Sequence, residues 1–599
     1  MRVEFFGPLG RVTGSSALLS DDRLGVRILV DAGIQQGEGA PEQWNRGPLP
    51  FDAATLTHIV LTHAHIDHCG LLPRVVKEGF GGTVLCTPET EALARLLLED
   101  CARVSKDYSV EDARRVRFEA RDAAFGTRLT INRDVCVQFF PTAHILGSIA
   151  ARFSWGGGGP AERSIIFSGD LGTNVDGQER FLLLRHRMAP PPSTFAVVES
   201  TYGDRERALV SESFAGRIEG LRCALRAARR RGGTTLIAVF AMDRLQTMLL
   251  DLACVAGQDN ELARTPVFVQ TPLGRRISSV YARFVRARDG SGAGAPPRWL
   301  SKAAFPLFGL SADDVEHVRM LEDAVVAVLD PDASVRSPLA GLPRAHRWIH
   351  REITPTEPTI IVATGGMLEG GPIVRYLPDV LTDPNSTVIL TGYAAPSTLA
   401  GRLSTIGGLS MAARSRLPGS VHLPDGSSIP SRAVSAHITK VCGYSGHADR
   451  GGIVDWLVDE RAGKQSLAGQ TVFIQHGTDA GREGLRRALQ ERAPWMKVVC
   501  PTAECATYDL DASRSLSSGD LLVRIVEVAA RTFNERARRS TSVAARVHPP
   551  RAGRSLSDEP VRGAGTPTAR GAARGRPSRG CAGRRARPGG RAARARAGA

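Results

Sequence analysis

The hydrophobic positions of this chain fall mostly into short runs of four to seven residues. In the first 200 residues these runs cover residues 26–30, 135–140, 164–168 and 195–198. Short apolar runs bounded by glycine, proline or polar residues are typical of buried strands. Residues 88–101 instead repeat leucine at helical spacing behind Thr87 and Pro88, which predicts a helix with a threonine cap and a proline in its first turn. The pattern indicates an α/β fold.

A second set of apolar runs lies in the middle of the chain. It covers residues 234–240, 266–270, 359–363 and 387–390. Several of these runs are followed by helical patterns, as in parallel α/β units. Glycine turns close them, and Gly365 and Gly366 form one such turn. Backbone N–H groups in turns at helix starts suit phosphate groups, although an ordinary strand-to-helix turn has the same sequence character.

The runs divide the chain into four parts. A strand pattern at residues 471–475 repeats the character of the N-terminal part. We therefore predict one domain split between residues 1–208 and 432–530, with a parallel α/β domain inserted at 209–431. Residues 531–599 form a separate tail.

The tail accounts for the net charge of the chain. It contains 18 arginines, no lysine and three acidic residues, which is +15 of the total of +16, so the other 530 residues are nearly neutral. With few large apolar residues it cannot bury a core, and we predict that it is disordered. Its charge would attract polyanions. A tail of GC-rich coding character with no selected role is the alternative.

Length and composition narrow the class of protein. A chain of 599 residues is too long for one core and predicts two or three domains. The sequence has no long uncharged apolar run and no secretory pattern, so we expect a cytoplasmic protein without membrane contact. The ten cysteines include no C-x-x-C pair, and neither a disulfide framework nor a thiolate zinc site is indicated.

Residues 61–70, LTHAHIDHCG, carry the clearest chemical signal. They follow an apolar run and place four ligand-type residues in six positions: His63, His65, Asp67 and His68. Imidazole nitrogen and carboxylate oxygen are the usual ligands of zinc. In a loop after a strand, the first two side chains can point to one side while the last two turn toward a second point. We therefore predict a site for two metal ions.

Further ligand-type residues follow other predicted strands. They are His144, Asp170, Glu199 and His476, with His447 among small residues near the end of the chain. Catalytic residues of α/β folds lie just past the carboxyl ends of strands. We expect His144 to be a third ligand of the first metal and Asp170 to bridge the two metals.

Asp31 follows the strand pattern at residues 26–30. An acid in this place can accept a hydrogen bond from a ligating histidine and fix its tautomer. The alternative is an aspartate that only forms the turn before Gly33.

These features together resemble the β-CASP family of metallo-β-lactamase-fold nucleases, over about residues 1–510. The resemblance also includes residues 7–16 (GPLGRVTGSS), 241–246 (AMDRLQ), 364–371 (TGGMLEGG) and 392–403 (GYAAPSTLAGRL). It implies an αββα sandwich with an inserted β-CASP domain that caps the active site. One departure is the sequence QTPLG at residues 270–274, where the family usually has S-P-x-A.

The resemblance also implies roles for single residues. One zinc ion would be held by His63, His65 and His144, and the second by Asp67, His68 and His476, with Asp170 between them. The implied catalytic residues are Asp67, Glu199, His447 and Asp31. His447, tuned by Glu199, would protonate the leaving oxygen. Contacts to the RNA backbone would come from Arg244, Ser445, Gly446, Gly365 and Gly366.

The function that follows is a zinc-dependent hydrolase of RNA phosphodiester bonds, with two Zn²⁺ ions per chain. We expect endonucleolytic cleavage of mainly single-stranded RNA that leaves a 5′-phosphate and a 3′-hydroxyl, and a homodimer is one candidate assembly. The alternatives are an RNase J-like 5′ to 3′ exoribonuclease and a small-molecule metallo-hydrolase of the same superfamily. A catalytically inactive RNA-binding subunit and a DNA-repair nuclease fit less well, because no metal ligand is missing and His476 is present.

Overall fold

The fold is taken from a computed structural model that describes residues 1–511. Within this range the description leaves out residues 37–41, 106, 160–161, 177, 179, 190, 208–210, 293–294, 335, 393 and 459–470. The tail predicted to be disordered, residues 531–599, lies outside the described residues.

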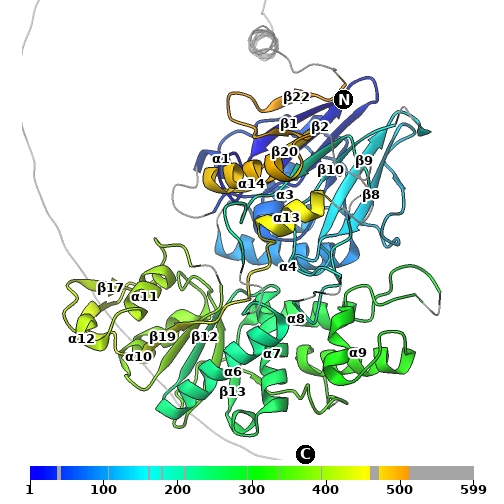
Figure 1. Cartoon of the computed structure of the whole chain (residues 1–599). Helices are drawn as coiled ribbons and strands as arrows, with labels where there is room; N and C mark the ends of the chain where they lie inside the picture. Colours follow the sequence, from blue (N-terminus) through cyan, green and yellow to red (C-terminus); the bar gives the residue numbers. More distant parts are fainter. Residues whose placement is uncertain are drawn as a thin grey trace, which may run out of the picture. The chain divides into compact units, whose positions relative to one another are not determined.

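Two seven-stranded sheets form the split domain (Figure 1). In spatial order the first sheet consists of β22 (Thr507–Asp509), β1 (Arg2–Gly7), β2 (Ser16–Asp21), β3 (Val26–Val30), β4 (His58–Val60), β5 (Val84–Cys86) and β6 (Phe118–Ala120). The second consists of β21 (Lys497–Val499), β20 (Thr471–Ile474), β11 (Phe195–Val198), β10 (Arg163–Phe167), β9 (Ile149–Trp155), β8 (Val135–Pro141) and β7 (Leu129–Thr130). The strands predicted in this part of the sequence are all present, within a residue of the expected ends.

An apolar core fills the space between the two sheets. Its centre includes Phe5 of β1 and Phe473 of β20, whose ring centroids are 5.4 Å apart. Helices α3 (Leu72–Lys77) and α4 (Pro88–Val104) cover the outer face of the first sheet. Helices α13 (Arg450–Leu457) and α14 (Asp479–Arg492) cover the outer face of the second. The predicted αββα sandwich is therefore confirmed.

Short helices complete this domain. They are α1 (Glu42–Arg46), α2 (Ile66–Cys69) and α5 (Val110–Arg115). Helix α4 begins as its sequence predicts, because the Thr87 hydroxyl accepts a hydrogen bond from the Thr90 N–H and Pro88 occupies the first turn.

The two ends of the sandwich sequence pair with each other across the insertion. Strand β1 pairs antiparallel with β22, and β11 pairs in parallel with β20, with Val198 opposite Ile474. Residues that follow β11 and β20 therefore lie side by side although about 275 residues separate them in sequence.

The inserted domain contains a six-stranded parallel sheet (Figure 1). Its spatial order is β14 (Arg347–Trp348), β13 (Val267–Gln270), β15 (Ile360–Thr364), β12 (Thr235–Val239), β16 (Thr387–Leu390) and β19 (His437–Lys440). One face packs on α6 (Phe214–Arg231), α7 (Arg244–Gln258), α8 (Pro272–Phe284) and α9 (Val315–Leu329). The other packs on α10 (Leu377–Thr382) and α11 (Leu399–Gly407). Helix α12 (Met411–Arg414) and the hairpin of β17 (Ser420–His422) and β18 (Ser428–Pro430) follow α11.

Two details differ from the sequence prediction. Strand β19 pairs with β16, so the inserted sheet continues past the boundary expected at residue 431. Its four residues alternate too weakly to reveal their sheet from the sequence. Strand β12 ends at Val239, one residue before the predicted end, and leaves Phe240 outside the sheet with 39% of its surface exposed.

The segment between α8 and β14, which had no function in the sequence, attaches the inserted domain to the sandwich. Trp299 is buried, and its indole N–H donates to Glu89 Oε1 of α4 at 2.8 Å. The Leu184 N–H donates to the Trp299 carbonyl at 2.6 Å, and the Arg298 guanidinium lies over the ring of Phe125. A buried carboxylate is stable only with such partners, so Glu89 and Trp299 hold the two domains in one arrangement.

No helix within the described residues is both long and apolar enough to span a lipid bilayer.

The Glu89–Trp299 contact can be tested by Trp299→Phe, which keeps an aromatic ring and removes the donor. Loss of a hydrogen bond to a buried charged group should lower the free energy of unfolding by about 1–3 kcal/mol, measured by urea denaturation. Trp348→Phe is the matched control, because the buried Trp348 Nε1 has no hydrogen-bond partner in the described structure. Equal effects of the two substitutions would show that the contact does not hold the domains together.

Candidate metal centre

The loop after β4 and the short helix that follows it present the four ligand-type residues in two pairs. His63 and His65 lie in the extended part of the loop, and His65 is the residue that precedes α2. Helix α2 then carries Asp67 and His68. The change from extended to helical backbone separates the two pairs, as predicted for two metal positions.

The first cluster contains three histidines from two loops. His63 Nε2 and His65 Nδ1 are 3.0 Å apart, and His144 Nε2 lies 3.1 Å from His65 Nδ1. His144 reaches this position because β8 ends at Pro141, three residues before it. The three nitrogens face a common point, and one oxygen of Asp170 also lies close to this point.

The second cluster joins the first loop to the end of the described chain. His68 Nε2 and His476 Nε2 are 3.0 Å apart, and Asp67 Oδ2 lies 3.7 Å from His476 Nε2. His476 follows β20, the strand that pairs with β11.

Asp170 lies between the two clusters and turns one oxygen to each. Its Oδ2 is 3.5 Å from His63 Nε2 and 3.4 Å from His144 Nε2. Its Oδ1 is 3.3 Å from His68 Nε2 and 3.6 Å from His476 Nε2. The structure therefore brings together all seven residues predicted as ligands.

The donor set fits a pair of zinc ions. Ligand atoms about 2.0–2.1 Å from a tetrahedral zinc ion lie about 3.3–3.4 Å from one another, close to the spacings within each cluster. Asp170 Oδ1 is also buried without a hydrogen-bond partner among the described residues. An acceptor in that state is stabilised by a cation.

Four of the five clustered histidines, all except His65, make a contact through their other ring nitrogen in the described structure. The strongest case is His68, whose Nδ1 lies 2.8 Å from Asp31 Oδ2 and therefore leaves Nε2 for the metal position. Asp31 is held in turn by the N–H and the hydroxyl of Thr62, both at 2.8 Å. This is the geometry expected for an acid that fixes the tautomer of a ligand.

Three other contacts of this kind were not expected from the sequence. Thr62 Oγ1 lies 3.1 Å from His63 Nδ1, Thr201 Oγ1 lies 3.2 Å from His476 Nδ1, and the Gly446 carbonyl lies 3.3 Å from His144 Nδ1. The signal available for the two threonines is their place within two residues of a predicted site residue at a strand end.

Burial and neighbouring charges set the protonation of the clusters. Burial lowers the pKa of His63 and His144 well below the ordinary value, and it lowers the pKa of His65 to about 4. These imidazoles are therefore neutral, the form that binds metals. Burial opposes a charge on His68 too, but Asp170 and Asp31 outweigh it and raise the pKa of His68.

Glu199 and His447 form a pair beside the first cluster. His447 Nδ1 lies 3.2 Å from both Glu199 oxygens, and Glu199 also accepts from the N–H groups of Leu171 and Thr201, at 2.7 Å and 3.2 Å. His447 Nε2 faces the centre, 3.9 Å from Asp170 Oδ2. Burial lowers the pKa of His447, but the nearby Glu199 charge more than offsets this and raises it.

Several site loops hold their side chains through strained backbone. Asp31, Ala143, Asp243 and His476 all have positive φ, between 54° and 65°. Each such residue without glycine's freedom costs on the order of 1 kcal/mol. All four lie at or next to the residues of the centre, which is where structures retain such strain.

The residues predicted to contact substrate divide into two groups. Arg244 lies against Gly446, where a Cβ would collide with its guanidinium, and Arg244 Nη1 is buried without a hydrogen-bond partner in the described structure. The Ser445 hydroxyl donates to the Tyr202 hydroxyl at 2.9 Å. Gly365 and Gly366 instead follow the carboxyl end of β15, and Gly366 lies beside Phe240.

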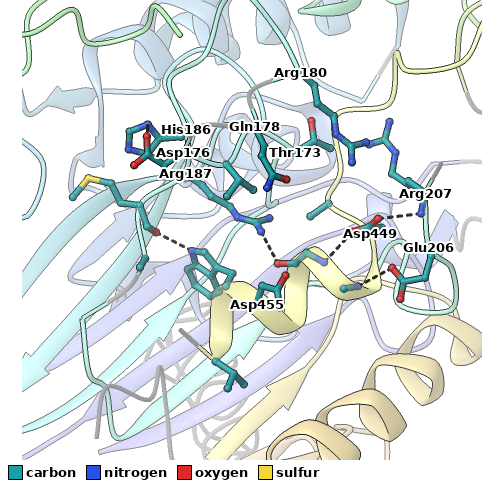
Figure 2. Close-up of a pocket in the computed structure, with 18 of the residues that line it drawn as sticks. Thr173, Asp176, Gln178, Arg180, His186, Arg187, Glu206, Arg207, Asp449 and Asp455 are labelled. Atoms are coloured by element: carbon teal, nitrogen blue, oxygen red, sulfur yellow. Dashed lines mark hydrogen bonds and ion pairs between the residues drawn. The ribbon is translucent and has the colours of Figure 1, made fainter. Parts of the chain in front are cut away.

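A cavity of about 770 Å³ is lined by residues that follow Asp170 and His447 in the sequence, among them Thr173 and Asp449 (Figure 2). Arg187 lines it and is buried; it donates to the carbonyls of Gly172 at 3.0 Å and Gly452 at 2.7 Å. Gly172 lies two residues after Asp170, and Gly452 lies five residues after His447. Arg187 thus connects the bridging carboxylate loop to the His447 loop, a role with no signal in the sequence.

An αββα sandwich with histidine and aspartate clusters at its strand ends is the framework of a metallo-hydrolase. Residues 10–186 match the Metallo-beta-lactamase superfamily, and residues 245–403 match the Beta-Casp domain. The chain belongs to the β-CASP family of the metallo-β-lactamase superfamily.

Curated relatives extend over most of the chain. It is 30% identical to Ribonuclease TTHA0252 of Thermus thermophilus over 77% of this chain and 91% of that protein. It is 26% identical to Transcription termination factor FttA of Cenarchaeum symbiosum over 81% of this chain and 67% of that protein. A third relative, RNase J-like protein of Methanocaldococcus jannaschii, is 25% identical over 63% of this chain and 74% of its own length.

The role of Asp31 can be tested by Asp31→Asn. Loss of the carboxylate removes the acceptor that holds the His68 tautomer, so zinc affinity should fall by about 10- to 100-fold. Competition with a chromophoric chelator, together with metal content by mass spectrometry, measures this. Asp22→Asn is the control, because the Asp22 side chain is 80% exposed. An unchanged affinity in Asp31→Asn would mean that Asp31 only forms the turn.

Proposed function

We propose that this chain is a zinc-dependent ribonuclease that holds two Zn²⁺ ions and cleaves RNA internally, leaving a 5′-phosphate and a 3′-hydroxyl. The observation that carries the proposal is the position of Asp170, which turns one oxygen to each of two ligand clusters beside the Glu199–His447 pair. Such a centre suits hydrolysis of a phosphodiester, in which an anionic group and a leaving oxygen are stabilised together.

The ligand clusters define where the reaction takes place. His63, His65 and His144 would hold one ion, and Asp67, His68 and His476 the other. Zinc, when bound, lowers the pKa of water to about 7 and offsets negative charge on the phosphate. Burial keeps His63, His65 and His144 neutral. The second contacts of His63, His68, His144 and His476 select the tautomers of these rings.

His447 is suited to give a proton to the leaving 3′-oxygen. Glu199 holds the N–H at Nδ1 and stabilises the charged ring, while Nε2 faces the centre. A general acid needs this combination of free nitrogen and sufficient basicity. Glu199 in turn is held in place by the N–H groups of Leu171 and Thr201.

Arg244 is suited to bind the RNA backbone. Its guanidinium lies near His144 and Gly446, and one of its nitrogens is buried without a partner in the described residues. A phosphate oxygen is a strong acceptor for such a donor. The N–H groups of Ser445 and Gly446 would lie on the same side of the centre.

RNA is favoured as substrate by the relative named a ribonuclease, which this chain covers almost completely. The RNase J-like relative supports a second candidate, a 5′ to 3′ exoribonuclease. The inserted β-CASP domain and the Glu199–His447 pair distinguish both from a small-molecule hydrolase. We expect the RNA to be single-stranded and the site of action to be the cytoplasm.

His447→Ala tests the proton transfer. Cleavage of RNA should fall by about 10²- to 10⁴-fold with zinc content unchanged, because general acids contribute that much. The loss should be much smaller for a p-nitrophenyl phosphodiester, whose leaving group departs as a stable anion. His422→Ala, at an exposed position of β17, is the control. Equal losses on the two substrates would assign His447 a structural role, and loss of zinc would make it a ligand.

A circular RNA tests the mode of cleavage. An endonuclease should linearise a circular oligonucleotide and should cut a linear one whatever its 5′ end. Denaturing gel electrophoresis of both products measures this, with the Asp67→Ala protein as the inactive control. An intact circle, with mononucleotides released from a 5′-phosphorylated linear strand, would establish the exoribonuclease instead.

A further inference from the structure

Among the described phenylalanine and tryptophan residues of the inserted domain, one lies exposed at the surface. It is Phe240, at 39%; Trp495 of the sandwich, at 58%, is the other exposed residue of these two types in the described part of the chain. Burial of a phenylalanine is favourable by about 1.5–3 kcal/mol. A phenylalanine ring that stays exposed directly after an inner strand of the sheet therefore needs an explanation.

The position of Phe240 is defined by the parallel sheet. It directly follows β12, which lies between β15 and β16. In parallel sheets all carboxyl ends share one edge, and the same edge ends β19 at Lys440, seven residues before His447. The edge that carries Phe240 is thus the edge from which the chain returns to the metal centre.

The connections of the sheet diverge beside Phe240. After β12 the chain passes through α7 to β13 on one side, and after β16 it passes to β19 on the other. Ligands of open α/β sheets bind in the crevice formed at such a point, outside the carboxyl ends of the strands. Phe240 follows β12 and Gly392 follows β16, so both lie at this point of the sheet's carboxyl edge.

Two glycine turns make room for the ring. A Cβ at Gly366 would lie 2.7 Å from the ring of Phe240, and a Cβ at Gly392 would lie 3.2 Å from it. The Cδ2–Cε2 side of the ring faces both glycines. The backbone at these glycines packs against one side of the ring, and 39% of the Phe240 surface remains exposed.

Phe240 is also close to the predicted phosphate contact. The Leu245 N–H donates to the Phe240 carbonyl at 3.1 Å, so the four residues between them form a tight turn that ends at Arg244. Arg244 in turn lies against Gly446 near the first metal cluster. A strand of RNA whose phosphate is bound by Arg244 therefore passes the ring within a few nucleotides.

We propose that Phe240 is a stacking platform for one unpaired base of the RNA, held in place by Gly366 and Gly392. The inference rests on the proposed ribonuclease function. Bases of single-stranded RNA stack on exposed aromatic side chains whatever their identity, because every base has an aromatic face. Phe240 is thus a positioning residue that sets which phosphate reaches the centre, and it gives Gly366 a role besides a phosphate contact.

The test uses the full zinc-loaded chain and an unstructured RNA in which single nucleotides near the cleavage site are replaced, one at a time, by abasic ones. For the wild type, kcat/KM should fall by on the order of tenfold at one abasic position. The Phe240→Ala variant should show a similar loss of kcat/KM on the intact RNA. An abasic nucleotide at that one position should then cause no further loss in this variant. Phe240→Trp should restore the wild-type pattern.

The control is Trp495→Ala. Trp495 precedes β21, on the edge of its sheet opposite to the metal centre, so its substitution should leave the abasic profile unchanged. Zinc content and thermal midpoint verify that each variant is folded. Equal losses of wild type and Phe240→Ala at every abasic position would overturn the stacking role. A wild type that hydrolyses small phosphodiesters but no RNA would refute the proposed function itself.

Discussion

The arrangement on which this fold depends is the burial of six histidines and three other acidic residues around Asp170. Buried ionisable groups are unfavourable unless each has a partner. Here every histidine of the two clusters has a second contact or a shared centre, and the carboxylates accept hydrogen bonds from backbone, threonine or imidazole donors. Removal of any one partner leaves a neighbour unsatisfied, so the residues of the centre are interdependent.

The two sheets of the sandwich bring the ends of several strands together at the metal centre. Five loops that meet at the centre follow β3, β4, β8, β10 and β20, and the pair of β11 with β20 brings Glu199 and His476 side by side. The inserted domain is attached through Trp299 and Glu89 on one side and through the return of the chain from β19 on the other. The inserted domain is therefore connected to the sandwich at two places.

The sequence predicted the strands well because short apolar runs do not need distant residues to be recognised. The candidate ligands were visible for the same local reason, since several of them follow such a run by two or three residues. The boundary of the inserted domain was placed too early, since a four-residue strand such as β19 takes its identity from its neighbour β16. The contacts of Thr62, Thr201 and Arg187 were missed, because threonine and arginine are common and only their three-dimensional neighbours give them a role.

The sequence alone determined that two groups of metal ligands, an acid–histidine pair and an inserted parallel α/β domain belong to one molecule. The tertiary structure decided how they are used. It turned Asp170 between the clusters, joined the segments after Asp170 and His447 through Arg187, and left Phe240 exposed at the carboxyl edge of the inserted sheet. The physical reason is that side-chain type and period are properties of the local chain, whereas burial, hydrogen bonding and exposure depend on segments hundreds of residues apart that only the folded sheets bring into contact.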